Sequence, residues 1–329
     1  MPLLRDIFIH LSENQFLNNS TKKMGLKFGA NKVVGGVSID DTIERIKDIN
    51  DQEMSVVFDN LGEFITDKED AIQEKGKIIA MINAIHEFGV DSHASVKLSQ
   101  IGLQIDYDFC LNNIDEIIAV ANKLDIFVNI DMESYNLYPD TLRILDAMLE
   151  KYDNVGTVIQ AYLLNSPDDI LKYKDTRLRI VKGAYKESAD AAHQDKADID
   201  KAYLELIKSH LTEGTGYTSI ATHDHHIIEE IIDFIEQNDI DHDRFEFQML
   251  YGFRKDYQKN LVKRGYKMVV YLPFGMDWYA YFMRRLAERP QNINLIVKSV
   301  TKHPAFKPAA FGTAGILSLF TIVKLFKRK

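Results

Sequence analysis

The chain of 329 residues is 46% hydrophobic and 27% charged, as expected for a globular protein of one large domain or two smaller ones. It carries 49 acidic and 40 basic side chains, and the resulting net charge of −9 argues against nucleic acid as its main partner. Cys110 is its only cysteine, so no disulfide can form within the chain, and a reducing compartment such as the cytoplasm is expected.

Residues 1–52 predict an N-terminal helical arm. The opening apolar run is too short and too polar for a signal peptide, and we expect a docking helix there. Ser38, followed by Asp41, predicts the capped start of a second helix. The apolar positions that recur at helical spacing are Leu3, Leu4, Ile7, Phe8 and Leu11 in the first helix, and Ile43, Ile46 and Ile49 in the second.

Residues 53–303 predict a single barrel domain. Eight short apolar segments recur at intervals of roughly 25–40 residues, each followed by a charged segment with helical periodicity. Short buried strands separated by helices pair in parallel, and a count of eight favours a closed (β/α)8 barrel of the TIM type over an open doubly wound sheet. No GxGxxG motif follows any segment, which argues against a Rossmann cofactor site. The predicted strands are residues 55–63, 93–102, 126–134, 155–163, 177–185, 219–225, 245–252 and 268–275.

Each predicted strand begins apolar and ends in polar groups that a buried strand would not otherwise carry. Because the carboxyl ends of the strands line the active site in such barrels, this pattern predicts an enzyme. The polar groups are Asp59 and Glu63, Lys97, Asp131 and Glu133, Gln160, Lys182 and Tyr185, His223 and Asp224, Gln248 and Tyr251, and Tyr271.

The last predicted strand, residues 268–275, leads into a helix that is expected to begin at Trp278. Arg284 and Arg285 project about 100° apart on this helix, so one of them can reach inward. Guanidinium groups match the two oxygens of a carboxylate, which favours a carboxylate clamp. The alternative is an exposed charged face on which Arg284 pairs with Glu288.

Two lysines leave other chemistry open. Lys97 and Asp131 lie on neighbouring predicted strands and can form a buried ion pair, either structural or catalytic. Lys97 or Lys182 can instead form a Schiff base, as in barrel aldolases.

A histidine cluster at residues 223–226 raises the question of a metal site. His223 and His225 alternate with Asp224 along the chain, and no second cluster at ligand spacing follows the first strand. We therefore expect no metal.

Aromatic side chains are expected to converge near the arginine pair. They would form a small apolar box beside the carboxylate clamp, suited to a compact amino acid with an apolar ring. The members of this box are Tyr185, Tyr271 and Tyr281, together with Leu250.

Five motifs, taken in order, resemble those of the proline dehydrogenase family. They are RIVKGAY at 179–185, ATHD at 221–224, FEFQMLYG at 245–252, YLPFG at 271–275 and YFMRRLAE at 281–288. The resemblance covers roughly residues 50–300 and is closest to monofunctional bacterial enzymes. Members of this family are FAD-dependent and built on a distorted (β/α)8 barrel, so the resemblance implies that fold and that cofactor.

The resemblance also implies how proline would be bound. Arg284 and Arg285 match the pair that grips the carboxylate of proline, and Lys97 matches a third cation on it. Asp131 matches the acid that holds Lys97 and the two arginines in place. The remaining matches are the ring walls Tyr185, Leu250, Tyr271 and Tyr281, the bracing acid Glu288, and Glu63 as a gate that pairs with Arg284 over bound substrate.

For the flavin, Arg179 matches a guanidinium near N5, and Gln160 matches a donor at the ring edge. Two departures from the family pattern concern the adenosine half of FAD: Asp224 stands where many relatives carry Asn, and Lys186 where many carry Trp. The positions that match the rest of the FAD site are Lys182, Gly183, Thr222, His223, Asp224 and Gln248.

The implied reaction is oxidation of L-proline to Δ1-pyrroline-5-carboxylate, the first step of proline catabolism to glutamate. The reduced FAD would pass its electrons to a quinone. The alternatives are an aldolase that uses Lys97 or Lys182, and a non-catalytic amino-acid sensor on the same scaffold.

Residues 304–329 form an apolar and basic tail. Residues 309–323 carry no charge but are shorter than the stretch of about 20 residues that spans a bilayer. Lys324 and residues 327–329 add positive charge suited to anionic headgroups. With a membrane quinone as acceptor, this pattern predicts a tail helix lying in the membrane interface and peripheral attachment on the cytoplasmic face. The alternative is a final helix packed on the barrel.

Overall fold

The computed structural model describes residues 30–62 and 65–288, together with residues 8, 10–12, 14 and 26. Within this part of the chain, no helix is both long and apolar enough to cross a membrane. The predictions for Glu63 as a gate, for most of the first helix and for the tail of residues 304–329 lie outside the described residues. The side chain of Glu288 lies outside them as well.

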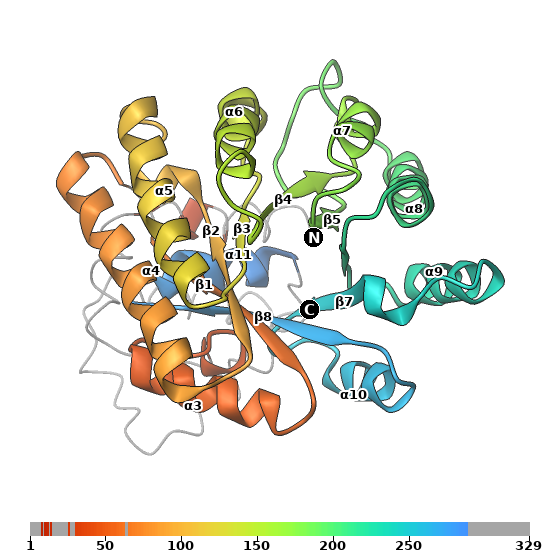
Figure 1. Ribbon diagram of the computed structural model, residues 1–329, viewed down its shortest axis with the longest axis horizontal. Coiled ribbons are helices and arrows are strands. Elements are labelled where there is room, and N and C mark those ends of the chain that lie inside the picture. Colours follow the sequence, from red (N-terminus) through yellow and green to blue (C-terminus); the bar gives the residue numbers. More distant parts are fainter. Residues whose placement is uncertain are drawn as a thin grey trace, which may run out of the picture.

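Eight parallel strands form a closed barrel, in which each strand pairs with the next along the chain and β8 pairs with β1 (Figure 1). The predicted TIM-type barrel is therefore confirmed. The strands are β1 Ser55–Asn60, β2 Ser92–Val96, β3 Val128–Ile130, β4 Val155–Gln160, β5 Leu178–Val181, β6 Thr218–Ala221, β7 Phe245–Leu250 and β8 Met268–Phe274.

The structure corrects the carboxyl ends of the predicted strands. β2 ends at Val96 and β3 at Ile130, whereas the predicted strands extended to residues 102 and 134. After β2 the chain turns at once into a 3-10 helix, Leu98–Ile101, and leaves the sheet. Lys97 and Asp131 therefore stand on the rim of the barrel, one residue beyond their strands, where their side chains can face a ligand.

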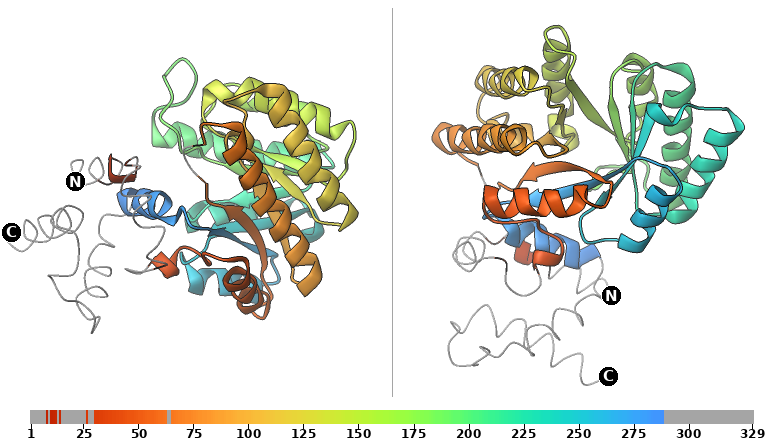
Figure 2. Two further views of the ribbon diagram at one scale, coloured as in Figure 1. Left: turned by 90° about the vertical axis from the view of Figure 1, so that its left-hand side faces the viewer. Right: turned by 60° about the horizontal axis from the view of Figure 1, so that its bottom comes forward.

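The helices form a ring around the barrel, in which α3 takes the place expected for the helix after β8 (Figure 1). Helix α3 precedes β1 but packs on β1 and α4, and it fills the place between α4 and α10. Helix α11, which follows β8, instead lies across one end of the barrel (Figure 2). In a regular barrel the helix after the last strand would complete the ring, so this exchange accounts for the expected distortion. The helices are α3 Ile39–Asn50, α4 Lys68–Phe88, α5 Tyr107–Lys123, α6 Tyr138–Leu149, α7 Ser166–Lys172, α8 Lys196–Glu213, α9 His225–Gln237, α10 Lys255–Lys263 and α11 Trp278–Glu288, with short 3-10 turns at Ala30–Lys32, Tyr135–Leu137 and His242–Arg244.

Helix α3 begins where its cap was predicted. The Ser38 side chain accepts a hydrogen bond from the backbone N–H of Asp41 at 3.2 Å. Ile43, Ile46 and Ile49 are buried in the main apolar core. This part of the predicted arm is thus a wall of the barrel, while the domain boundary at residue 52 stays a prediction.

The interior of the barrel is largely polar. Outward-facing strand residues such as Val56 and Phe58 belong to the apolar core shared with the helices. The interior instead holds Ser95, Arg179 and Glu246, all at most 5% exposed. Barrels of this type are usually filled by branched apolar side chains. Here the interior carries hydrogen-bonding groups that need partners.

A second apolar cluster positions α11. Trp278, Phe282 and Met283 pack there with Val34, from the segment before α3, and with Phe8. Helix α11, which carries Arg284 on its other face, is therefore held in place by residues from the beginning of the chain.

Candidate active site

A cavity of about 1120 Å³ opens at the carboxyl ends of the strands and is bordered by α11. It brings together residues from all parts of the barrel, as the predicted polarity of the strands required. The predicted site residues that line it are Lys97, Asp131, Gln160, Arg179, Lys182, Gly183, Tyr185, Thr222, His223, Gln248, Leu250, Tyr271, Tyr281, Arg284 and Arg285.

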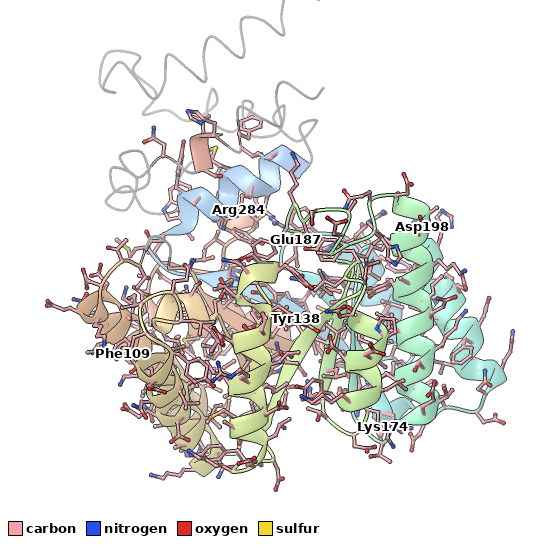
Figure 3. The ribbon with its side chains drawn as sticks, turned by 90° about the horizontal axis from the view of Figure 1, so that it is seen from above. Phe109, Tyr138, Lys174, Glu187, Asp198 and Arg284 are labelled. Carbon is pink, nitrogen blue, oxygen red and sulfur yellow. The ribbon has the colours of Figure 1, made fainter. Side chains whose placement is uncertain are left out.

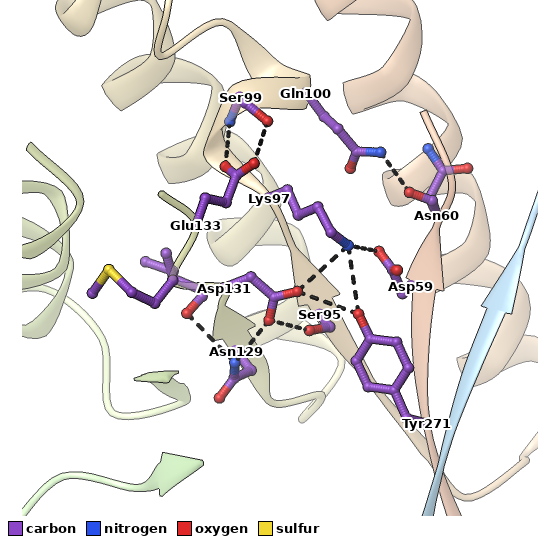
Figure 4. A network of polar contacts seen from close by, with 12 residues as sticks. Asp59, Asn60, Ser95, Lys97, Ser99, Gln100, Asn129, Asp131, Glu133 and Tyr271 are labelled. Carbon is purple, nitrogen blue, oxygen red and sulfur yellow. Dashed lines mark hydrogen bonds and ion pairs between the residues drawn. The ribbon is translucent and has the colours of Figure 1, made fainter. Parts of the chain in front are cut away.

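Lys97 lies at the centre of a buried polar network (Figure 4). Its Nζ contacts Asp59 Oδ1 at 2.5 Å, and it lies 3.5 Å from both Asp131 Oδ2 and Tyr271 Oη. Tyr271 Oη donates to Asp131 Oδ2 at 3.3 Å. The predicted contact between Lys97 and Asp131 is confirmed, but the nearer partner of Lys97 is Asp59, which the sequence indicates only as one of the polar groups at the strand ends.

The second oxygen of Asp131 faces across the barrel. It accepts hydrogen bonds from Ser95 Oγ at 2.6 Å and from Arg179 Nη2. Arg179 also donates to Ser95 at 3.0 Å, and its guanidinium carbon lies 5.2 Å from the centre of the Tyr271 ring. Asp131 therefore joins Lys97, in the expected substrate half, to Arg179, in the expected cofactor half. Its contact with the arginines of α11 stays a prediction.

The electrostatics of this network fix the charge of Lys97. Burial lowers the pKa of Lys97, but Asp59, Tyr271 and Asp131 together raise it well above its ordinary value. Burial raises the pKa of Asp131, but Arg179 and Lys97 outweigh that effect and bring it below its ordinary value. For Asp59 burial prevails over Lys97, and its pKa is raised. Lys97 is thus a permanent cation at neutral pH, and Asp131 is ionised.

Helix α11 carries the paired arginines over the same cavity, and Figure 3 shows Arg284 on this helix above the barrel. The helix begins at Trp278, as predicted. Arg284 and Arg285 are both half-buried, and the Arg285 guanidinium lies 5.1 Å from the centre of the Tyr281 ring. This position favours the clamp over an exposed charged face.

The expected ring walls differ in their exposure. Tyr281 is 6% exposed and Tyr185 is 41% exposed, although both line the cavity. Tyr281 is buried because it also packs in the apolar cluster of α11, whereas Tyr185 lies partly at the surface.

Four buried polar groups of the cavity have an atom that lacks a hydrogen-bond partner among the described residues. These atoms are Gln100 Oε1, Gln160 Oε1, Gln248 Oε1 and Arg179 Nη1. Buried polar atoms are rarely left unpaired in native proteins, so these four point to a ligand that completes them. Gln160, Gln248 and Arg179 are the three that the family resemblance assigns to the FAD site, whereas Gln100 was not among the predicted site residues. The cavity, at about 1120 Å³, is also larger than an amino acid alone requires. The residues present fit a flavin dinucleotide.

The expected role of Gln160 as a donor at the flavin edge stays a prediction. In the structure its Nε2 donates to the backbone oxygens of Met132 at 2.9 Å and Glu133 at 3.2 Å. The atom left for a ligand is Oε1, which is an acceptor. An amide carries both kinds of group, and its surroundings decide which one faces the cavity.

The loop after β5 is shaped by a glycine. Gly183 has φ +114°, and a Cβ there would lie 2.3 Å from a ring carbon of Tyr162. Beside it, Lys182 pairs with Asp200 and lies 3.7 Å from Asp224 Oδ2. The other oxygen of Asp224 caps α9 through the N–H of His226 at 3.2 Å. Asp224 does not line the described cavity, so its contact with a cofactor stays a prediction.

His223 also has a structural partner. Its Nε2 accepts a hydrogen bond from the backbone N–H of Leu250 at 3.0 Å, which ties the end of β6 to that of β7. The neighbouring Thr222 accepts from the backbone of Asp224 at 3.2 Å. Both side chains thus help to hold the rim on which they lie.

Three residues that contact the site, Ser95, Glu246 and Asp59, have no specific role predicted from the sequence. Ser95 and Lys97 are two residues apart, as are Glu246 and Gln248, and residues at that spacing in a strand face the same side. That spacing was the available signal for Ser95 and Glu246. For Asp59, the signal was its place at the end of the strand beside that of Lys97.

Fold and site together define a (β/α)8 barrel. Its cavity contains a charged network and buried polar atoms that have no partner among the described residues. The chain belongs to the proline dehydrogenase family, whose sequence profile, described as "Proline dehydrogenase", matches residues 42–296. Proline dehydrogenase 2 of Bacillus subtilis (strain 168) is 43% identical over 302 residues, which cover 91% of this chain and 99% of that one. Proline dehydrogenase of Deinococcus radiodurans is 40% identical over 280 residues, covering 83% of this chain and 90% of that one.

Solved structures support the fold. Proline utilization A from Bdellovibrio bacteriovorus, inactivated by N-propargylglycine, superposes with a TM-score of 0.77 at 21% identity. The superposition covers 92% of this chain and 38% of that one, so this chain spans little more than a third of that protein.

Proposed function

We propose that the protein oxidises L-proline to Δ1-pyrroline-5-carboxylate, with FAD as the hydride acceptor. The observation that carries this proposal is that one cavity joins Lys97, Arg284 and Arg285 to buried atoms of Gln160, Gln248 and Arg179 that have no partner among the described residues. Membership of the proline dehydrogenase family supports the same reaction.

The substrate half of the cavity suits an amino acid carboxylate. Lys97, Arg284 and Arg285 provide three cations on its walls, and Arg offers a planar fork that matches both carboxylate oxygens. Holding the carboxylate in this way would fix the orientation of the proline ring relative to the flavin, which lowers the entropic cost of bringing the two reactants together. Tyr271, Tyr281 and Leu250 would pack against the ring itself.

Proline must lose a proton from its amine before a hydride can leave the adjacent carbon. Positive charges near the amine lower its pKa and so favour the neutral form. Asp59 and Asp131 act in the opposite direction, but they are paired with Lys97 and Arg179. Since the pKa of Lys97 is raised, Lys97 stays charged and acts as a binding group rather than as a base.

The cofactor half would hold FAD through Arg179, Gln160 and Gln248. When bound, FAD supplies the electron-accepting ring that the side chains of the chain lack. Arg179 is 5% exposed. The positive charge of its guanidinium would favour an electron-rich flavin ring beside it.

A single assay tests the proposed reaction. Protein purified with FAD should be yellow and should reduce an artificial dye only when L-proline is present. A yellow protein that does not reduce the dye with proline would refute the reaction while retaining the cofactor.

The aldolase alternative is not favoured by the surroundings of the two lysines. A Schiff base forms from a neutral amine, whereas the partners of Lys97 raise its pKa, and Lys182 pairs with Asp200. Borohydride trapping of a substrate on either lysine would overturn this conclusion. A sensor, the other alternative, would not retain the flavin, so the purified protein would bind proline and be colourless.

For the later steps, we propose that the electrons pass to a quinone and that the protein is cytoplasmic, with its tail on the membrane. The composition of residues 309–329, apolar with a basic end, supports this proposal. Deletion of residues 309–329 should preserve dye-linked activity and abolish co-sedimentation with anionic vesicles. Unfolding or loss of FAD in the truncated protein would show that the tail packs on the barrel instead.

A further inference from the structure

Several hydrogen bonds converge on Glu246 in the interior of the barrel. Glu246 lies on β7 and is 4% exposed. Its carboxylate accepts from Arg177 Nη2 at 2.9 Å and from Ser219 Oγ at 2.7 Å. It also accepts from Tyr217 Oη at 3.1 Å and from Gln248 Nε2 at 2.7 Å. Glu246 is absent from the lining of the described cavity, so its link to a ligand runs through Gln248.

Glu246 is held in its ionised form. Burial raises the pKa of its carboxyl, but Arg177 and the hydrogen bonds from Ser219 and Gln248 outweigh burial and bring the pKa below its ordinary value. An ionised carboxylate accepts hydrogen bonds and donates none.

The charge of Glu246 therefore decides the orientation of Gln248. The NH2 end of the Gln248 amide must face the carboxylate, and the carbonyl end must face away from it. That carbonyl oxygen is buried and has no partner among the described residues. Gln160, across the cavity, has the same arrangement, since its NH2 group is engaged by two backbone carbonyls and its oxygen is left over.

We propose that Glu246 is a positioning residue that holds the carbonyl oxygen of Gln248 in the cavity, so that this wall takes a hydrogen-bond donor of the bound cofactor. The inference rests on the proposed binding of FAD. FAD offers such donors in its sugar and ribityl hydroxyls and in the N–H of its flavin ring. In Glu246→Gln, the new amide can either donate or accept, so Gln248 is free to turn its NH2 group into the cavity.

The test is a double-mutant cycle on FAD affinity in the full-length holoprotein. The dissociation constant is measured by dilution, from the fluorescence that FAD regains on release. Glu246→Gln should weaken binding roughly tenfold, the value of about one hydrogen bond. Gln248→Met should weaken it by a similar factor. In the Gln248→Met background, Glu246→Gln should cause no further loss, because the group it positions is gone.

Tyr217→Phe is the matched control. It removes one hydrogen bond from the same carboxylate without touching Gln248, so FAD affinity should stay unchanged. If Glu246→Gln fails to fold because the charge of Arg177 is left buried, the paired variant Arg177→Met with Glu246→Gln removes both charges and takes its place in the cycle.

Two results overturn the inference alone. The first is an unchanged FAD affinity in Glu246→Gln. The second is that Glu246→Gln weakens FAD binding by the same factor in the Gln248→Met background as in the wild-type protein. The second result would mark Glu246 as a general structural group. If the wild-type protein binds no FAD, the proposed function itself fails, and the inference fails with it.

Discussion

Asp131 and Asp59 both contact Lys97, but their replacement should have unequal effects on stability. Asp131 accepts hydrogen bonds from Ser95 and Arg179 on one oxygen, and its other oxygen lies 3.5 Å from Lys97. The Arg179 side chain is 6% exposed, and Asp131 is its ion-pair partner. Asp131→Asn leaves that guanidinium buried beside a neutral amide. Removing one partner of a buried pair costs about 3–5 kcal/mol in the free energy of unfolding.

Asp59→Asn should cost less, although Asp59 lies only 2.5 Å from Lys97. Burial raises the pKa of Asp59, so its ionised form is the one that the folded protein disfavours. After the substitution, Lys97 still has Asp131 and Tyr271 within 3.5 Å. The expected loss is about 1 kcal/mol, the value of an ordinary hydrogen bond.

The difference between the losses of unfolding free energy in Asp131→Asn and Asp59→Asn should depend on pH. The folded-state pKa of Asp131 is lowered, so its contribution is present above the unfolded value of about 3.9 and is lost as the pH falls through the folded value. The folded-state pKa of Asp59 is raised, so its contribution is complete below about 3.9 and is lost as the pH rises through the folded value. This difference should therefore be largest at neutral pH and should narrow in acid.

Urea unfolding followed by far-UV circular dichroism measures these losses, at neutral and acid pH and at one FAD concentration, because bound cofactor adds stability. The single tryptophan, Trp278, reports on α11 and would not replace this global probe. Equal losses at neutral pH, or a larger loss in Asp59→Asn, would refute the reasoning, since the shorter ion pair would then prevail over burial.

Three further predictions concern the site. Arg284→Met and Arg285→Met should each raise KM for proline and leave FAD bound, because a charge-assisted bond to a desolvated carboxylate is worth about 2–5 kcal/mol; unchanged KM in both variants would place the carboxylate elsewhere. Tyr281→Ser should lower kcat/KM for proline more than for 4-hydroxyproline, because Tyr281 is expected to pack on the ring and limit tolerance for a hydroxyl; an unchanged ratio of the two efficiencies would contradict this. Gly183→Ala should lower Tm, because backbone strain at φ +114° alone costs about 1–3 kcal/mol and the new Cβ would meet Tyr162. Gly76→Ala, in helix α4 with no atom within 4 Å of the added Cβ, is the matched control and should raise Tm slightly; equal effects of the two substitutions would remove the steric argument.

The sequence alone determined the architecture and most of the residues that line the cavity. Alternating short strands and helices predicted the barrel, Ser38 predicted the start of α3, and the helix after β8 was placed at Trp278. Lys97, Asp131, Gln160 and Lys182 were found because each follows or ends a strand, whereas Arg179 was found through the family resemblance. In a parallel barrel all the carboxyl ends lie at one rim, so position along a strand is enough to assign a residue to the cavity.

Only the tertiary structure decided how those residues are paired. The partners of Asp131 include Arg179, 48 residues away in the chain, and Arg179 in turn reaches Ser95, 84 residues away. The orientation of the Gln160 amide depends on two backbone carbonyls 27 and 28 residues away. Periodicity and capping preferences act over a few residues along the chain, whereas these contacts depend on distances across the barrel and on which groups burial leaves in need of a partner. For that reason the sequence identified Lys97 as a cation of the site, and only the folded barrel showed Asp59 to be its nearest counter-ion.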